Sequence, residues 1–220
     1  FFVNAALVAY WHAVLRGDGD FGAEARGGRI VRQLFMGIAG LVGLALLIWG
    51  GASLVRILLT MLVDRMGAAA DAGWQAYSVG TAFAQLLVGA WLAAANRSQW
   101  HEIVHMRPAE GQAALRRIYL YIAVIIGAIA TLAPAALVLR ELLLMLFSQS
   151  SAPLSTLFYK MIDPLSFVPV GLGVWLWHWN VLRREADAYG ESREGAVVRR
   201  IYYYLVAAVG LALLWVGNVE

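Results

Sequence analysis

Long apolar segments alternate with short polar ones along the whole chain. The apolar runs lie at roughly residues 1–15, 33–55, 76–95, 118–139, 165–182 and 201–217. Most of them approach the ~20 residues that a helix needs to cross the hydrocarbon core of a bilayer. We therefore expect an all-α integral membrane protein with six transmembrane helices.

These apolar runs recur with a spacing of about 84 residues. Residues 32–62 align with residues 116–146 without a gap, and the helix start at 116–121 returns at 199–204 as Arg-Arg-Ile-Tyr-x-Tyr. A constant spacing of this kind indicates internal duplication. We expect one membrane domain made of three parallel two-helix repeats, at residues 1–63, 75–147 and 164–218. The first repeat is expected to be N-terminally incomplete, because the sequence begins at Phe1 rather than at a methionine.

The same alignment places Gly50-Gly51 of the first repeat opposite Pro134-Ala135 of the second. Glycine pairs and proline both weaken a helix. We therefore expect a kink at the same depth in both helices.

Composition indicates a membrane protein, and the distribution of charge predicts its orientation in the membrane. Apolar residues make up 61% of the chain and charged residues 14%, which is too little polar surface for a soluble globule. Thirteen of the seventeen Arg and Lys residues fall in the loops 16–32, 97–117 and 183–200. The positive-inside rule places these loops in the cytoplasm, so every repeat has the same topology.

The counts of individual residue types indicate which membrane holds the protein and which partners to expect. Sixteen arginines against one lysine, with many Ala and Gly, suggest a GC-rich bacterial gene and hence the cytoplasmic membrane. The basic loops account for the net charge of +3, so no nucleic-acid partner is expected. The absence of cysteine excludes disulfides and Cys-ligated metal centres from this chain.

The sharpest chemical motif is His101-Glu102-Ile103-Val104-His105. On a helix, His101 and His105 would face the same way and could share a zinc ion, with Glu102 as the general base of a metalloprotease. No third ligand is visible after the motif. The motif also occupies an interhelical loop that the sister repeats fill with unrelated polar residues. We therefore expect no metal here and keep the metalloprotease as an alternative.

Two further kinds of site come from histidines and acids. His12 and His178 lie at similar depth on different helices and could ligate a haem, although both fit an aromatic belt at the membrane interface. A coupled transporter usually keeps an ionisable group inside the bilayer. All fourteen acids instead fall in predicted loops or interfaces. A transporter or haem-bearing anchor is therefore a further alternative, and no cofactor is expected.

Small and basic residues recur at equivalent positions of the repeats. The glycines that would let helices approach closely are Gly37, Gly40, Gly43, Gly127 and Gly210. The double arginines Arg116-Arg117 and Arg199-Arg200 could bind anionic lipid headgroups or act only as topology signals.

The helix starts at 116–121 and 199–204, preceded by Trp177-His178-Trp179 and Arg183-Arg184-Glu185-Ala186-Asp187, resemble the multi-pass bacterial proteins of domain-of-unknown-function family 5671. The similarity covers the second and third repeats well and the first weakly, since residues 33–37 depart from the arginine–tyrosine pattern. The resemblance implies the fold and brings no reaction or ligand. We therefore predict a non-catalytic scaffold or accessory subunit that contacts the bilayer, anionic lipids and other membrane subunits.

Overall fold

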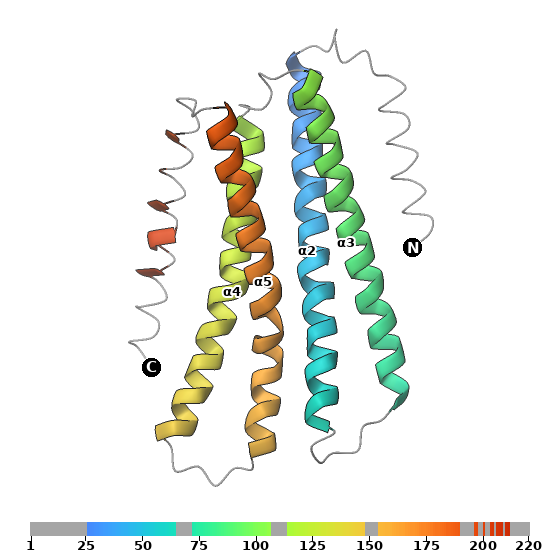
Figure 1. Cartoon of the computed structure of the whole chain (residues 1–220), viewed down its shortest axis with the longest axis vertical. Coiled ribbons are helices and arrows are strands. Elements are labelled where there is room, and N and C mark those ends of the chain that lie inside the picture. The colour runs from blue at the N-terminus through green and yellow to red at the C-terminus, as the bar shows by residue number, and fades with distance from the viewer. Residues whose placement is uncertain are drawn as a thin grey trace. The chain divides into compact units, whose positions relative to one another are not determined.

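The computed structural model describes residues 26–64, 72–106, 114–147 and 154–189, with short pieces between 196 and 211 (Figure 1). The long helices are α2 (Arg26–Asp64), α3 (Ala72–Met106), α4 (Ala114–Phe147) and α5 (Leu154–Tyr189). The chain divides into two compact units, Phe1–Phe35 and Met36–Glu220. The first unit holds the start of α2. The second holds the rest of α2 and the other three long helices.

Each long helix has a stretch apolar and long enough to cross a membrane. Within the described residues these candidate spans are Ile30–Asp64, Tyr77–His105, Leu115–Phe147 and Phe158–Ala188. The all-α membrane class is therefore confirmed, but with four such helices rather than six. The predicted first helix, 1–15, lies outside the described residues, and of the predicted last helix only pieces between Tyr203 and Leu211 are described. The described helices do not show the three repeats, which stay a prediction.

The helices extend well beyond the predicted apolar runs. α3 continues to Met106 instead of ending near 95, and α5 continues to Tyr189 instead of ending near 182. A 36-residue helix is ~54 Å long at 1.5 Å per residue, which exceeds the ~30 Å hydrocarbon core. Hydropathy marks only the part of a helix that lies in hydrocarbon. The predicted loops 97–117 and 183–200 are therefore partly helical.

The expected kink sites do not interrupt either helix. α2 is helical throughout Gly50-Gly51, and α4 is helical on both sides of Pro134. Membrane helices tolerate proline because nearby hydroxyls and helices satisfy freed backbone groups. Pro134 leaves the carbonyl of Ala130 without its helical N–H partner, whereas the nearby Thr131 hydroxyl donates a 2.8 Å hydrogen bond to the carbonyl of Gly127.

Small residues lie where α2 and α3 touch, at positions seven residues apart on each helix. A Cβ atom on Gly43 would lie 3.3 Å from the Gly89 carbonyl, and one on Gly50 would lie 2.9 Å from the Ala82 carbonyl. Gly43 and Gly50 are seven residues apart, as are Ala82 and Gly89. The two helices therefore touch backbone to backbone, as small-residue stripes allow in membranes.

A second set of contacts joins α4 and α5. A Cβ atom on Gly127 would lie 2.7 Å from the backbone nitrogen of Trp175, and one on Gly171 would lie 2.7 Å from the carbonyl carbon of Ala130. The buried core then joins three helices through Leu44 and Ile48 of α2, Ala123 of α4 and Val174 of α5. Among the glycines predicted to pack, Gly43 and Gly127 lie at backbone contacts and Gly40 faces the side chains of Asn96 and Tyr119. No atom of the described residues lies within 4 Å of a Cβ added to Gly37 or Gly210.

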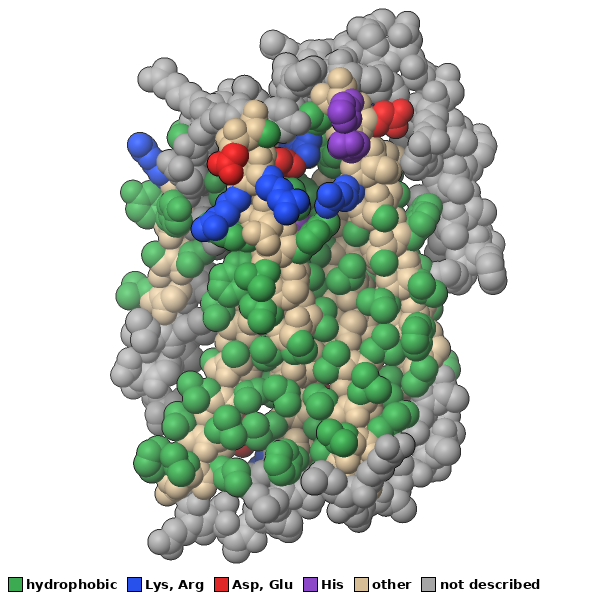
Figure 2. All heavy atoms as spheres, viewed as in Figure 1, with side chains coloured by type: hydrophobic (Ala, Val, Ile, Leu, Met, Phe, Trp, Pro, Cys, Tyr) green, Lys and Arg blue, Asp and Glu red, His purple; other side chains and the backbone are tan. Residues whose placement is uncertain are grey.

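Successive helices run in opposite directions, so α4 begins at the same end where α3 and α5 finish (Figure 1). We call this the basic end, because it carries Arg97, Arg116, Arg117, Arg183 and Arg184. The opposite end carries Arg56, Asp64, Arg140 and Asp163. Figure 2 shows charged side chains gathered at the basic end and hydrophobic ones over most of the rest of the visible face.

Candidate functional site

A cavity of about 210 Å³ lies at the basic end between α3, α4 and α5. Its polar lining is Asn96, Arg97, Trp100 and His101 from α3, Arg116 and Tyr119 from α4, and His178 and Glu185 from α5. The cavity exists where it does because α3 and α5 stay helical past their apolar runs. Their polar last turns are thereby held against the first turns of α4.

An ion pair and an aromatic ring join the three helices around this cavity. Arg116 donates a hydrogen bond from its guanidinium to Oε1 of Glu185, and the two side chains are only 13% and 17% exposed. The same guanidinium lies over the ring of Trp100, 5.1 Å from its centre. A cation held over an indole face is attracted by the ring's electron density. Arg116 therefore links α4 to both α5 and α3.

Glu185 departs from its predicted place in the loop 183–200. It lies on α5, near the end of the candidate span Phe158–Ala188. Its side chain is mostly buried beside Arg116, and this burial was not expected. The hydropathy pattern missed it because the partner, Arg116, is 69 residues away in the sequence.

Three polar atoms of the cavity wall are buried without a hydrogen-bond partner among the described residues. They are Oδ1 of Asn96, Nε1 of Trp100 and NH1 of Arg116. Asn96 and Trp100 are four residues apart and therefore share one face of α3, and they are 6% and 4% exposed. Buried polar groups in folded proteins are nearly always paired. Three residues that line the cavity therefore hold, between them, two donors and one acceptor that no described group satisfies.

His178 is part of the cavity wall and not of an interfacial aromatic belt. It is buried, and its Nδ1 donates a 2.9 Å hydrogen bond to the carbonyl of Val174. Its ring lies edge-on to Tyr119 and to Trp177. The belt interpretation does not hold for this residue because its ring packs against Tyr119 of α4 and does not reach the surface. His12, its suggested haem partner, lies outside the described residues.

The HExxH motif lies on a helix, which corrects its expected place in a loop. Nε2 of His101 and Nε2 of His105 are 3.1 Å apart on the outside of α3, and Glu102 is also exposed. Two imidazoles of one helix thus meet as the zinc motif requires. In the part of the chain that the structure describes, no third Asp, Glu, His or Cys completes a set of three possible ligands. The absence of a bound metal stays a prediction.

The two double-arginine motifs, Arg116-Arg117 and Arg199-Arg200, differ in burial. Arg116 lines the cavity and Arg117 is buried, whereas Arg200 is exposed and Arg199 lies outside the described residues. Sequence reasoning singled out Arg116 and Arg117 but missed Asn96 and Trp100. A signal for these two exists, because Asn96 interrupts an otherwise apolar run and Trp100 follows one helical turn later.

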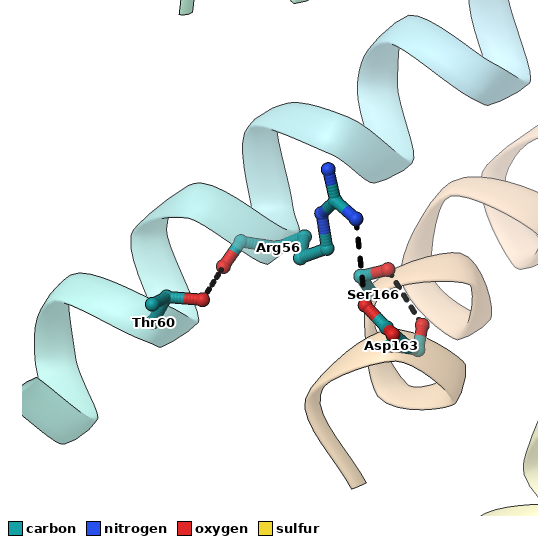
Figure 3. A network of polar contacts seen from close by, with 4 residues as sticks. All are labelled: Arg56, Thr60, Asp163 and Ser166. Atoms are coloured by element: carbon teal, nitrogen blue, oxygen red, sulfur yellow. Dashed lines mark hydrogen bonds and ion pairs between the residues drawn. The ribbon is translucent and has the colours of Figure 1, made fainter. Parts of the chain in front are cut away.

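The opposite end holds a looser polar cluster (Figure 3). NH1 of Arg56 on α2 lies 3.7 Å from Oδ1 of Asp163 on α5, with side chains 47% and 73% exposed. The Thr60 hydroxyl donates to the carbonyl of Arg56, and the Ser166 hydroxyl donates to the carbonyl of Asp163. This cluster ties α2 to α5.

Comparison with known proteins identifies the family. The family model described as domain of unknown function DUF5671 matches residues 33–163 and 158–219. No curated protein and no solved structure matches the chain. The two matches extend from residue 33 to residue 219 of 220. They include α2 from residue 33 on and the whole of α3, α4 and α5. The chain is therefore a multi-pass membrane protein that belongs to the DUF5671 family.

Proposed function

We propose that the chain is a non-catalytic scaffold or accessory subunit of a larger complex in a bacterial cytoplasmic membrane. The observation that carries this proposal is the apolar surface that the described helices leave uncovered. Each of them exposes large hydrophobic side chains near mid-span, such as Trp49 on α2, Leu87 on α3, Leu132 on α4 and Leu172 on α5. Such surface is stable only against lipid or against other apolar helices.

Two glycines on this surface favour contact with another helix. Among the described residues, no atom lies within 4 Å of a Cβ added to Gly37 or Gly173, and Gly173 lies between the exposed Leu172 and Leu176 on α5. Small residues on a membrane helix let a second backbone approach closely, and packing then replaces lipid contacts. A neighbouring subunit would gain most at these positions.

The proposal is tested by the size of the assembly extracted from native membranes with mild detergent. We expect a complex with other subunits, clearly larger than the 24.0 kDa chain. The variant Gly173→Ile should release the chain from it, because the side chain blocks close approach. The control Leu176→Ile changes a neighbouring exposed position and should leave the complex intact. A chain that is found only alone, or only with copies of itself, contradicts the proposal.

The finer architecture is also a proposal: six spans in three parallel repeats, with the basic end in the cytoplasm. The asymmetry of thirteen to four basic residues supports the orientation, and two successive matches to one family model support the duplication. Single cysteines can be placed on this cysteine-free background. Cysteines at Gly111 and Gly190 should react with an impermeant reagent only after the cells are opened, whereas one at Ser150 should react in intact cells. The reverse pattern would invert the topology.

A further inference from the structure

We propose that the cavity at the basic end binds the phosphate group of a lipid headgroup, specifically that of an anionic glycerophospholipid with free hydroxyls such as phosphatidylglycerol. The proposal stands on the cavity's unpartnered atoms, its charge and its depth. It does not depend on whether the chain assembles with other subunits.

The unpartnered atoms define which ligand groups the cavity accepts. Nε1 of Trp100 and NH1 of Arg116 are N–H donors that find no acceptor among the described residues. Both residues, Trp100 and Arg116, line the cavity. An indole N–H can only donate, and a guanidinium can only donate. The ligand must therefore present at least two acceptor oxygens to one side of the cavity, as a phosphate group does.

The third unpartnered atom is an acceptor, so the same ligand must also carry a hydrogen-bond donor. Oδ1 of Asn96 lies one helical turn from Trp100 and is an acceptor. A phosphodiester carries no N–H or O–H of its own. The hydroxyls of a glycerol headgroup supply one, so a hydroxyl-bearing phosphodiester satisfies all three atoms.

The charge of the wall favours an anion. Arg97 and Arg116 line the cavity with two positive charges, and Glu185 neutralises one of them. Arg97 is held near the cavity by its position over the ring of Trp177, 5.4 Å from the ring centre. One net positive charge therefore remains for a singly charged phosphodiester. Arginine suits this role because its planar fork matches phosphate oxygens.

The depth and size of the cavity fit a headgroup. Arg116 begins a stretch of α4 that runs to Arg140 at the opposite end, and 24 residues of helix span ~36 Å. This length exceeds the ~30 Å hydrocarbon core, so Arg116 lies at the level of the headgroups. A volume of 210 Å³ is many times the ~10–15 Å³ that a single water needs by the same measure. That is enough for a phosphate with a glycerol, while the acyl chains would lie along the apolar outer surface.

The test measures lipid binding to the purified full-length protein by native mass spectrometry. Phosphatidylglycerol, zwitterionic phosphatidylethanolamine and inorganic phosphate are each added to delipidated protein. We expect phosphatidylglycerol to bind in a 1:1 complex and more tightly than either of the others. Binding of inorganic phosphate without binding of phosphatidylglycerol would assign the site to a free anion and overturn the lipid assignment. Equal binding of the two lipids would overturn the charge argument.

Two substitutions locate the binding at the cavity. Trp100→Phe removes the N–H and keeps an aromatic ring under Arg116, and Arg97→Gln removes one positive charge. Each should weaken phosphatidylglycerol binding by about tenfold, as expected for a lost hydrogen bond or charge on an ionised ligand. The matched controls are Trp49→Phe, on the exposed surface of α2, and Arg140→Gln, at the opposite end, and both should bind as the unchanged protein does. Unchanged binding in Trp100→Phe and Arg97→Gln would overturn the proposal.

Discussion

The two ends of the second unit each hold an arginine–carboxylate pair between helices, yet the pairs differ in burial. Arg116 and Glu185 at the basic end are almost enclosed and border a cavity with unpartnered polar atoms. Arg56 and Asp163 at the opposite end are 3.7 Å apart and largely exposed (Figure 3). The same residue types therefore serve different purposes. Both pairs bridge two helices, and the enclosed pair also borders the cavity that we propose to bind a phosphate group.

The burial of each ion pair determines how much stability is lost when one of its partners is removed. Exposed ion pairs contribute about 0–1 kcal/mol, because water screens them and two side chains lose freedom. A buried pair contributes little net energy as a pair, but loss of one partner costs about 3–5 kcal/mol since a lone charge is left behind. The basic end should therefore be the more sensitive end to single substitutions.

The largest effect is expected at Glu185. Glu185→Leu leaves the Arg116 guanidinium without its carboxylate and should destabilise the protein by about 3 kcal/mol. The double variant Arg116→Leu with Glu185→Leu should recover most of this loss, because no lone charge remains. Thermal unfolding in detergent measures both. Equal destabilisation of the single and double variants would show that the enclosed pair behaves like the exposed one.

A smaller effect is expected midway between the ends, where neither ion pair contributes. A Cβ on Gly89 would lie 2.5 Å from the backbone nitrogen of Leu47, so Gly89→Ala must push α3 from α2. Overpacking of this kind costs about 1–3 kcal/mol. Gly80→Ala on the same helix meets no atom within 4 Å and should be neutral or stabilising by up to about 1 kcal/mol. A comparison of the two unfolding temperatures checks this, and the same sign in both variants would contradict it.

The exposed pair should matter less than either of these. Arg56→Gln is expected to lower stability by no more than about 1 kcal/mol, because the side chains of Arg56 and Asp163 remain open to solvent. The small loss should vanish at high salt, which already screens the pair. Unfolding measured at low and high salt tests this. A loss as large as that of Glu185→Leu would erase the difference between the two ends.

No effect on metal content is expected from the histidines on α3. Although Nε2 of His101 and Nε2 of His105 are 3.1 Å apart, zinc sites use three or four protein ligands. Elemental analysis of the purified protein should find zinc well below one atom per chain, and His101→Ala should not change the result. Stoichiometric zinc that is lost in His101→Ala, with proteolysis lost in Glu102→Gln, would make the chain an enzyme.

Much of the fold is predictable from the sequence. The apolar runs at 33–55, 76–95, 118–139 and 165–182 all lie inside the observed helices, because crossing a bilayer requires length and apolarity that the sequence displays directly. The helix ends are not predictable in this way. Residues 96–106 are polar enough to resemble a loop, yet they remain helical since headgroups and water accept polar side chains on a helix.

The site is less predictable than the fold. Arg116 stands out in the sequence as part of a repeated motif, but its contact with Glu185 depends on how α4 and α5 pack. The burial of His178 likewise depends on how its ring packs against Tyr119 of α4. Periodicity identifies which residues share one helix face, as Asn96 and Trp100 do. It does not identify which face of another helix they meet.

The central claim is that the basic end holds a phosphate group and the opposite end does not. A structure determined in nanodiscs that contain phosphatidylglycerol tests this most directly. We predict phosphate-shaped density within hydrogen-bond distance of Nε1 of Trp100 and NH1 of Arg116, and none beside Arg56 and Asp163. A cavity that contains only water, or that is closed by the chain's own side chains, would contradict the account.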